Sequence, residues 1–99
     1  MSAIWRFPIN VEEVAENKGY FTLDLPMGTE LLHLAVQERA PHAPCIWARV
    51  DQERPPIRRK FLLIGTGQEH PDLAGSKWQQ YVGTFQQQGF VFHVWEVPA

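Results

Sequence analysis

The fold class is decided by the stretch Phe90-Val91-Phe92-His93-Val94-Trp95-Glu96-Val97. Alternate residues of a β-strand point to opposite faces, and here both sets of side chains are mainly apolar. One set consists of Phe90, Phe92 and Val94, and the other consists of Val91, His93, Trp95 and Val97. A strand that is apolar on both faces is normally central in its sheet and covered on both sides. The stretch therefore predicts a buried strand in a layered β structure.

Six further segments show the same alternation or a short apolar run bounded by turn residues. They span residues 3–7, 20–25, 31–38, 45–50, 58–64 and 81–85. In segment 31–38 the alternation places Leu32, Leu34 and Val36 on one face, and Leu31, His33 and Ala35 on the other. With residues 90–97, these segments predict a mainly β fold. We expect an antiparallel meander of about seven short strands that forms either a sandwich or a small barrel.

The segments between the predicted strands leave room for at most one short helix. Residues 11–18 carry three glutamates and form either a helical turn or a solvated loop. Residues 68–80 are the longest connection, and their Leu73 and Trp78 are candidates to cover the second face of the last strand. With 99 residues, the chain has the length of one domain, spanning residues 1–99.

The composition argues against several classes of function. The net charge is −2, with 9 basic and 11 acidic side chains, which disfavours electrostatic binding to nucleic acid. No segment approaches the roughly 20 apolar residues of a membrane span. Cys45 is the only cysteine, so no intramolecular disulfide can form, and the first residues lack the apolar run of a signal peptide. We therefore expect a cytoplasmic protein without membrane association.

Several short motifs, in their order and spacing, resemble a family of small uncharacterised proteins encoded by tailed bacteriophages and their prophages. The motifs are Trp5-Arg6-Phe7, Leu25-Pro26-Met27-Gly28, Ile46-Trp47-Ala48-Arg49-Val50-Asp51, Gly65-Thr66-Gly67, Tyr81-Val82-Gly83-Thr84-Phe85 and Phe90-Val91-Phe92-His93-Val94. The resemblance covers nearly the whole chain. It implies a phage origin and expression inside a bacterial host. Because the family has no activity that can be named, it assigns no site residue to this chain.

A candidate binding surface is indicated by Trp47 and Arg49, which lie on one face of the strand predicted over residues 45–50. Tryptophan and arginine are enriched among the residues that dominate interface energies. The remaining tryptophans are Trp5, Trp78 and Trp95, and the four together are either core residues or parts of a stacking or binding surface. A basic group that is either a solvated edge or a docking patch comprises Arg54, Arg58, Arg59 and Lys60.

The turn Gly65-Thr66-Gly67 follows a predicted strand and is a candidate ligand contact. Backbone N–H groups in a glycine turn can form an anion-binding nest. However, the turn lacks the third glycine of the dinucleotide-binding fingerprint and the lysine of a phosphate-binding loop, and Glu69 follows it closely. A purely structural turn is therefore the alternative.

No catalytic motif is present in the sequence. Ser2 and Ser76 are the only serines and lie outside a G-x-S-x-G elbow, while Cys45 is expected to be a small core residue. The histidines are His33, His42, His70 and His93, and with a single cysteine they form no convincing set of metal ligands. We therefore expect no catalytic residue, no metal and no cofactor.

These observations favour a non-catalytic, phage-encoded binding protein that acts in the host cytoplasm. Its target would be a host protein or a small nucleotide-like ligand, so that it inhibits a host defence or sequesters the ligand. The alternative is a structural or assembly accessory of the phage particle. A small hydrolase is a third reading, supported by less.

We also expect a homo-oligomer, because few large apolar side chains are available to cover the second face of the last strand. A second copy would supply the cover through a two-fold contact at His93 and Trp95. The competing account is a closed small barrel in which residues 68–80 cap that face.

Overall fold

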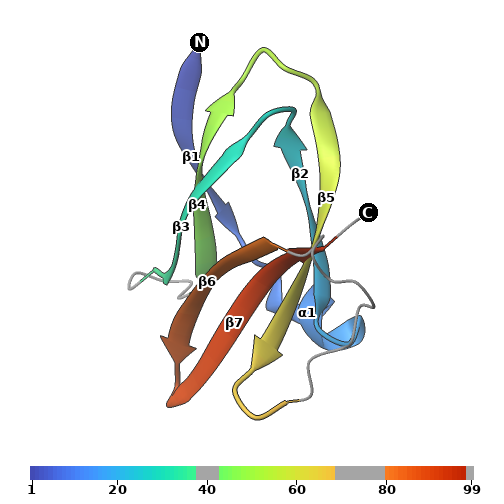
Figure 1. Ribbon diagram of the computed structural model, residues 1–99, viewed down its shortest axis with the longest axis vertical. Helices are drawn as coiled ribbons and strands as arrows, with labels where there is room; N and C mark the ends of the chain where they lie inside the picture. The colour runs from blue at the N-terminus through green and yellow to red at the C-terminus, as the bar shows by residue number, and fades with distance from the viewer. Residues whose placement is uncertain (38–42, 69–79, 98–99) are drawn as a thin grey trace.

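Short strands alternate with tight turns in the residues that the structure describes, which are 1–37, 43–68 and 80–97. Figure 1 shows the computed structural model. Its elements are β1 (Ser2–Pro8), α1 (Val11–Glu16), β2 (Tyr20–Pro26), β3 (Glu30–Val36), β4 (Pro44–Asp51), β5 (Pro56–Gly65), β6 (Gln80–Gln87) and β7 (Phe90–Val97). Most of the 68–80 connection, with Leu73 and Trp78, lies outside the described residues, as do His42 and His70.

The seven strands of the described residues form two antiparallel sheets, with strand orders β1–β4–β3 and β2–β5–β7–β6. The mainly β class predicted from the sequence is confirmed, and two sheets around one core make a sandwich. The strand order differs from the expected meander, since only β3–β4 and β6–β7 pair neighbours in the chain. Alternation identifies strands but carries no information about their partners. Strand β7 does lie between β5 and β6, the central position that its two apolar faces predict.

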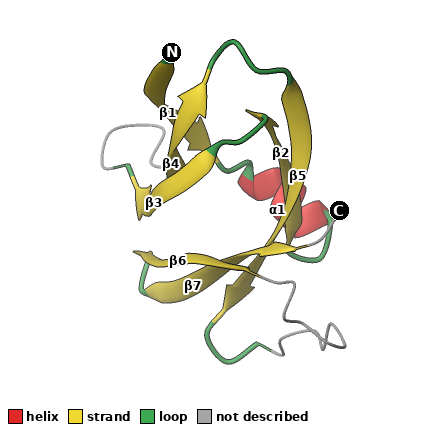
Figure 2. Cartoon of the chain, turned by 45° about the horizontal axis from the view of Figure 1, so that its top comes forward, coloured by secondary structure: helices red, strands yellow, loops and turns green. Residues whose placement is uncertain are grey.

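The hydrophobic core lies between the two sheets and takes side chains from both. Ile46 of β4 and Val94 of β7 are fully buried, and the rings of Phe21 and Phe61 stack with their centroids 5.1 Å apart. Burial of each such side chain contributes about 1.5–3 kcal/mol. The other buried members of this core are Ile9, Leu25, Leu34 and Phe85. Figure 2 shows the two sheets from another side, with α1 beside β2.

A β-bulge in β3 changes which leucine enters the core. The register of β3 against β4 shifts between Leu31 and His33. A bulge adds one residue to one strand and so interrupts the alternation of its side chains. Leu31 packs against the core with Leu34, whereas Leu32 is 47% exposed. The expectation that Leu32 shares the face of Leu34 is therefore wrong.

Asn10 is the N-cap residue of helix α1, and its side-chain oxygen accepts hydrogen bonds from the backbone N–H groups of Glu12 and Glu13 at 3.0 and 3.2 Å. Of the two readings left open for this segment, the helical turn is adopted. The chain then reverses at Gly19, where φ is 99°, and the Gly19 carbonyl accepts from the Leu63 N–H at 2.8 Å. A Cβ at Gly19 would lie 2.8 Å from the Leu63 carbonyl oxygen, so this close approach requires glycine.

Candidate functional site

Trp47 occupies the middle of the outer face of the sheet β1–β4–β3. It stands opposite Arg6 on β1 and His33 on β3, and the centroids of the Trp47 and His33 rings are 5.9 Å apart. Its neighbours in sequence, Ile46 and Ala48, are fully buried on the core side. Because successive side chains of a strand alternate between faces, Trp47 points away from the core. The side chain is half-buried among its outer-face neighbours.

Two arginines border Trp47 on the same face. Arg49 lies two residues further along β4, as the sequence predicts, and forms an ion pair of 2.5 Å with Glu30 of β3. The guanidinium of Arg6 donates a hydrogen bond to the side-chain oxygen of Gln37. Arg49 remains 55% exposed, so its charge is accessible to a partner.

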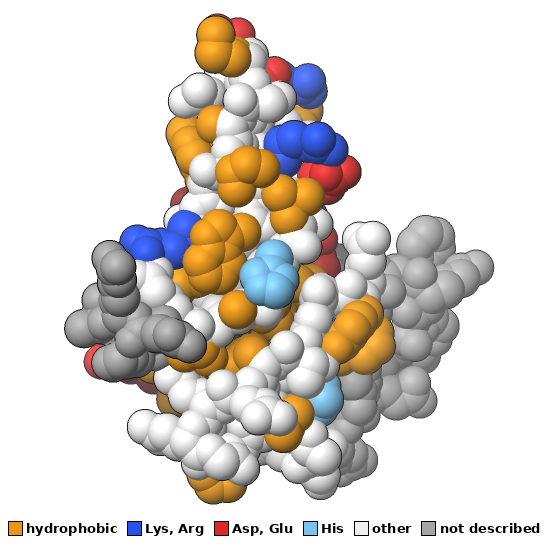
Figure 3. All heavy atoms as spheres, turned by 90° about the vertical axis from the view of Figure 1, so that its left-hand side faces the viewer, with side chains coloured by type: hydrophobic (Ala, Val, Ile, Leu, Met, Phe, Trp, Pro, Cys, Tyr) orange, Lys and Arg blue, Asp and Glu red, His pale blue; other side chains and the backbone are white. Residues whose placement is uncertain are grey.

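Exposed aliphatic side chains complete this surface. Ile4 stands opposite Arg49 in the β1–β4 register and is 58% exposed, and Leu32 is turned outward at the bulge of β3. We call the surface the Trp47 face; its members are Ile4, Arg6, Leu32, His33, Trp47 and Arg49. Figure 3 shows this side of the molecule, with hydrophobic side chains beside a histidine and basic side chains at their border.

Sequence reasoning found only Trp47 and Arg49 of this surface. His33 was detectable in principle, because β3 and β4 are neighbours in the chain and form a hairpin. Ile4 and Arg6 were not, because they depend on the pairing of β1 with β4, which no local pattern specifies.

Arg58, the third expected binding residue, does not join the Trp47 face. It lies on β5 in the other sheet, where its Nε donates to the Asp24 carboxylate at 3.1 Å. Both side chains of this pair are exposed. The hydrogen bond from Arg58 to Asp24 raises the pKa of the guanidinium further. For Arg58 this geometry favours a solvated position over a docking patch, whereas Arg59 of the same group is paired with Glu96 and only 18% exposed.

In the turn Gly65-Thr66-Gly67, the backbone N–H groups of Gly65 and Thr66 donate to acceptors within the chain. The Gly65 N–H donates to the side-chain oxygen of Gln68 at 2.6 Å, and the Thr66 N–H donates to the Val91 carbonyl at 2.9 Å. An anion nest needs such groups free. The geometry therefore supports the structural reading of this turn over the ligand-contact reading.

His93 joins this turn to β6 through a chain of hydrogen bonds that the sequence did not reveal. Its Nε2 lies 2.7 Å from the Thr66 hydroxyl and its Nδ1 lies 2.9 Å from the Thr84 hydroxyl, which also bonds to the Tyr81 hydroxyl. A neutral imidazole donates from one nitrogen and accepts at the other, so the four groups fit one continuous direction of donation. Both ring nitrogens take part in this chain of hydrogen bonds, which fixes the orientation of the imidazole.

Trp95, the other residue expected at an oligomer interface, is half-buried on the outer face of its sheet. Its ring meets that of Tyr81 edge-on, with centroids 5.1 Å apart. On the same face, Leu62 and Val97 are only 1% and 6% exposed within the single chain. The apolar surface that motivated a contact at His93 and Trp95 is therefore partly covered already, and that contact stays a prediction.

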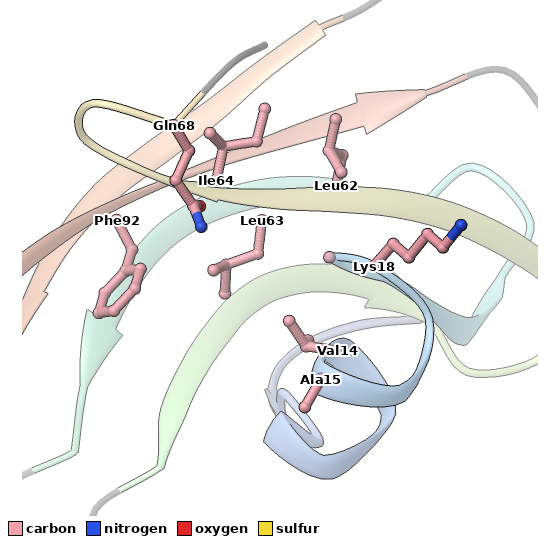
Figure 4. Close-up of a pocket in the computed structure, with 9 residues that line it drawn as sticks. Val14, Ala15, Lys18, Leu62, Leu63, Ile64, Gln68 and Phe92 are labelled. Carbon is pink, nitrogen blue, oxygen red and sulfur yellow. The ribbon is translucent and has the colours of Figure 1, made fainter. Parts of the chain in front are cut away.

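A cavity of ≈ 650 Å³ lies between α1 and β5, where β5 runs past the start of β2 (Figure 4). Leu63 points from β5 toward the helix, Phe92 and Gln68 lie at one end, and the amine of Lys18 lies at the other. The volume is within the range of small-molecule sites. Lys18 and Gln68 are the polar side chains of the described lining, and the Gln68 oxygen already accepts a hydrogen bond from the turn.

Two features of the described residues bear on catalysis and metal binding. Cys45 is 2% exposed, and burial raises the pKa of its thiol, with a smaller opposing effect of Arg6. Within these residues, no three His, Cys, Asp or Glu side chains come close enough to hold a metal ion. Nor do they include a helix with the length and apolar character needed to cross a membrane.

The geometry defines a small two-sheet β protein with an open aromatic and basic face. Residues 1–99 match a family described as a domain of unknown function, DUF7352, and the chain belongs to that family. No curated protein and no solved structure matches the chain. The description of the family names no activity, so the Trp47 face and the cavity beside α1 are the features that bear on function.

Proposed function

We propose that the protein acts without catalysis, by binding another protein through the Trp47 face. The observation that carries the proposal is the exposure of Ile4 and Leu32 beside the half-buried ring of Trp47. Exposed apolar groups with a polar rim are typical of interaction sites. Tryptophan at the centre of such a surface is among the residues that contribute most to binding.

The charges on the face indicate the chemistry of the partner. Arg6 and Arg49 border the apolar groups, and Glu30 neutralises only one of them. A partner with an apolar anchor and a carboxylate at its edge fits this arrangement, because arginine binds carboxylates with two parallel hydrogen bonds.

One observation supports binding over catalysis. Cys45 is buried with a raised pKa, which disfavours the reactive thiolate.

The resemblance to small phage proteins supports the finer form of the proposal. In that form the protein is phage-encoded, acts in the cytoplasm of the bacterial host and inhibits a host protein, for example one that serves in defence. An accessory role in particle assembly is the alternative. It uses the same kind of surface against a phage protein.

A second candidate, sequestration of a small ligand, is favoured by the cavity beside α1. The apolar side chains that line it, together with the cation of Lys18, fit a ligand with an apolar body and one anionic group. A nucleotide would need more donors for its phosphates than this cavity offers, so we rank this candidate below protein binding.

The proposal is tested by comparing tagged wild type, Trp47→Ala and Phe90→Ala in a bacterial host. Phe90 is a matched control, because it is a 66% exposed aromatic residue on the other sheet. We expect a defined protein to co-purify with wild type and Phe90→Ala. Its affinity for purified Trp47→Ala should be roughly thirtyfold weaker, the loss that corresponds to a hot-spot residue worth about 2 kcal/mol.

Equal retention of every co-purifying protein by the three variants would refute binding through the Trp47 face. Recovery of a small anionic molecule from wild type, lost in Lys18→Ala, would support the second candidate instead. Presence of the protein in purified phage particles would favour the assembly role.

A further inference from the structure

Strand β1 has a regular backbone edge that no other strand of the described residues pairs with. It is the end strand of β1–β4–β3, so half of its N–H and C=O groups point away from β4. Its residues pair with β4 without any shift of register, from Ser2 opposite Asp51 to Pro8 opposite Cys45. An uninterrupted edge of this kind is the template to which another strand adds.

The other sheet edges in the described residues are protected. At β2, the Glu13 carboxylate of α1 accepts hydrogen bonds from the N–H and the hydroxyl of Thr22, both at 3.3 Å. Strands β3 and β6 lie so close that a Cβ on Gly83 would come within 3.1 Å of the Leu34 Cβ. Bulges, covering helices and charged side chains are the usual ways to block an edge. Of these, β1 has only the charge of Arg6.

The exposed side chains of β1 add apolar surface to this open backbone. Ile4 and Trp5 are 58% and 40% exposed, and as successive residues they lie on opposite faces of the strand. A strand added beside β1 would cover both faces of the edge at once.

We propose that a second copy of this chain pairs with β1, antiparallel and about a two-fold axis at Ile4, to form one continuous six-stranded sheet. Pro8 lacks an N–H and is left outside the pairing frame, in which Ile4 of one copy lies opposite Ile4 of the other. In this frame Trp5 of each copy lies opposite Ala3 of the other, and each large ring meets a small side chain. Parallel pairing in register would instead place Trp5 against Trp5.

Charge complementarity favours a second copy over an unrelated peptide. In the same frame Arg6 of one copy lies opposite Ser2 of the other, and Asp51 lies opposite that serine on β4. Two strand spacings, roughly 9.6 Å, separate the backbones of Arg6 and Asp51, a distance that the two side chains span over the small serine. Asp51 already lies 3.5 Å from the N-terminal amine of its own chain and accepts a hydrogen bond from the Glu53 N–H at 3.1 Å, both through Oδ1. The contact with Arg6 would therefore use Oδ2 of this 41% exposed side chain. The two-fold axis forms the Arg6–Asp51 contact twice.

Cysteine trapping tests the position of the axis, independently of any partner protein and of the proposed function. Ile4→Cys places two thiols face to face at the axis, at a separation between Cα atoms that a disulfide bridges. Leu32→Cys is the matched control, because Leu32 is an exposed aliphatic residue on the same sheet but not on its edge. We expect the disulfide-linked dimer to form at least about tenfold faster for Ile4→Cys, because thiols held together have an effective concentration in the millimolar range.

A charge exchange tests the register. Arg6→Glu and Asp51→Arg should each weaken the wild-type dimer roughly tenfold in sedimentation equilibrium, and the double variant should recover most of the loss. Circular dichroism of each variant establishes that it is folded.

Three results would overturn the proposal. One is a wild-type monomer at high micromolar concentration, and another is equal cross-linking of Ile4→Cys and Leu32→Cys. The third is a dimer that Trp95→Ala dissociates and Ile4→Lys leaves intact, which would place the contact on β7 instead.

Discussion

The outer faces of the two sheets carry similar residues in opposite situations. On β2–β5–β7–β6, Leu62 and Val97 are 1% and 6% exposed, whereas Leu32 and Ile4 on β1–β4–β3 are 47% and 58% exposed. We call the first the closed face and the second the open face. The difference teaches that a strand with two apolar faces does not by itself indicate a partner. The sequence places an uncovered surface at β7, whereas in the structure Leu32 and Ile4 of the other sheet are the exposed aliphatic side chains of this comparison; the contact at His93 and Trp95 stays a prediction.

The Arg59–Glu96 and Arg49–Glu30 ion pairs differ in solvent exposure in the same way as these aliphatic side chains. Arg59 makes two hydrogen bonds of 2.6 Å to the Glu96 carboxylate and a third of 2.8 Å to the Thr29 carbonyl, and the paired side chains are each 18% exposed. Arg49 and Glu30 form a single contact and are more than half exposed. The first pair thus depends on its partners for solvation, while water solvates the second.

The largest expected difference is between Leu62→Ala and Leu32→Ala. Leu62→Ala should lower the free energy of unfolding by about 2–4 kcal/mol, because it leaves a cavity at a buried site. Leu32→Ala should change it by less than about 0.5 kcal/mol, since the side chain is largely solvated already. Urea denaturation measures both values. Similar losses in the two variants would show that the closed face is not closed in solution.

The second comparison removes one charge from each Arg–Glu pair. Glu96→Gln should lower the free energy of unfolding by about 2 kcal/mol, because it leaves the shielded Arg59 guanidinium without its counter-charge. Glu30→Gln should lower the free energy of unfolding by at most about 0.5 kcal/mol, as expected for an exposed ion pair. Urea denaturation again supplies the measurement, and a larger cost for Glu30→Gln than for Glu96→Gln would contradict the contrast.

The sequence predicts the strands well and the surfaces poorly, for a physical reason. The alternation of apolar and polar residues predicts each strand locally, and the two apolar faces of β7 also predict its central position in the sheet. Strand partners are set by packing between distant parts of the chain. The pairing of β1 with β4 brings Ile4 to the Trp47 face, and no local sequence pattern predicts this pairing. The outward turn of Leu32 depends on a bulge, which alternation alone cannot reveal.

Because strand partners have no local sequence signal, the contact between Thr66 and His93 could not be predicted either. Sequence reasoning assigned them to different sites, a ligand turn and an oligomer interface. The register of β5 and β6 on β7 brings the turn and Thr84 to the two sides of His93. The hydrogen bonds that result are therefore a property of the assembled sheet.

A third prediction concerns the hydrogen-bonded side chains of Thr66, His93, Thr84 and Tyr81 on the outer face of β2–β5–β7–β6. Thr84→Val removes the hydroxyl that links Tyr81 to His93 while keeping the shape of the side chain. Because the groups are exposed, we expect a loss of only about 0.5 kcal/mol in the free energy of unfolding. The ring resonances of His93 in NMR spectra should shift in Thr84→Val and in Thr66→Val, but not in Leu32→Ala on the open face. Unchanged ring resonances in Thr84→Val would show that the hydroxyl does not contact His93.

The smallest effect is expected at Cys45, which marks the end of the open face. Cys45 belongs to the same outward-pointing set of β4 as Trp47 and Arg49, yet it is only 2% exposed. Burial raises the pKa of the thiol, so the folded state favours its neutral form. The resulting stabilisation is fully present below the pKa of an unfolded thiol, about 8.5, and is lost as the pH rises above it.

Wild type should therefore lose slightly more stability between pH 7 and pH 10 than Cys45→Ala, in which lysine and tyrosine titrate in the same way but the thiol is absent. Urea denaturation at the two pH values gives the difference. The native thiol should also react with a disulfide reagent at pH 8 much more slowly than the thiol of the urea-unfolded chain, because both its access and its thiolate fraction are reduced. A native rate equal to the unfolded rate would mean that the open face extends past Trp47 to Cys45, and the boundary between open and closed surface would have to be moved to β4's first residue.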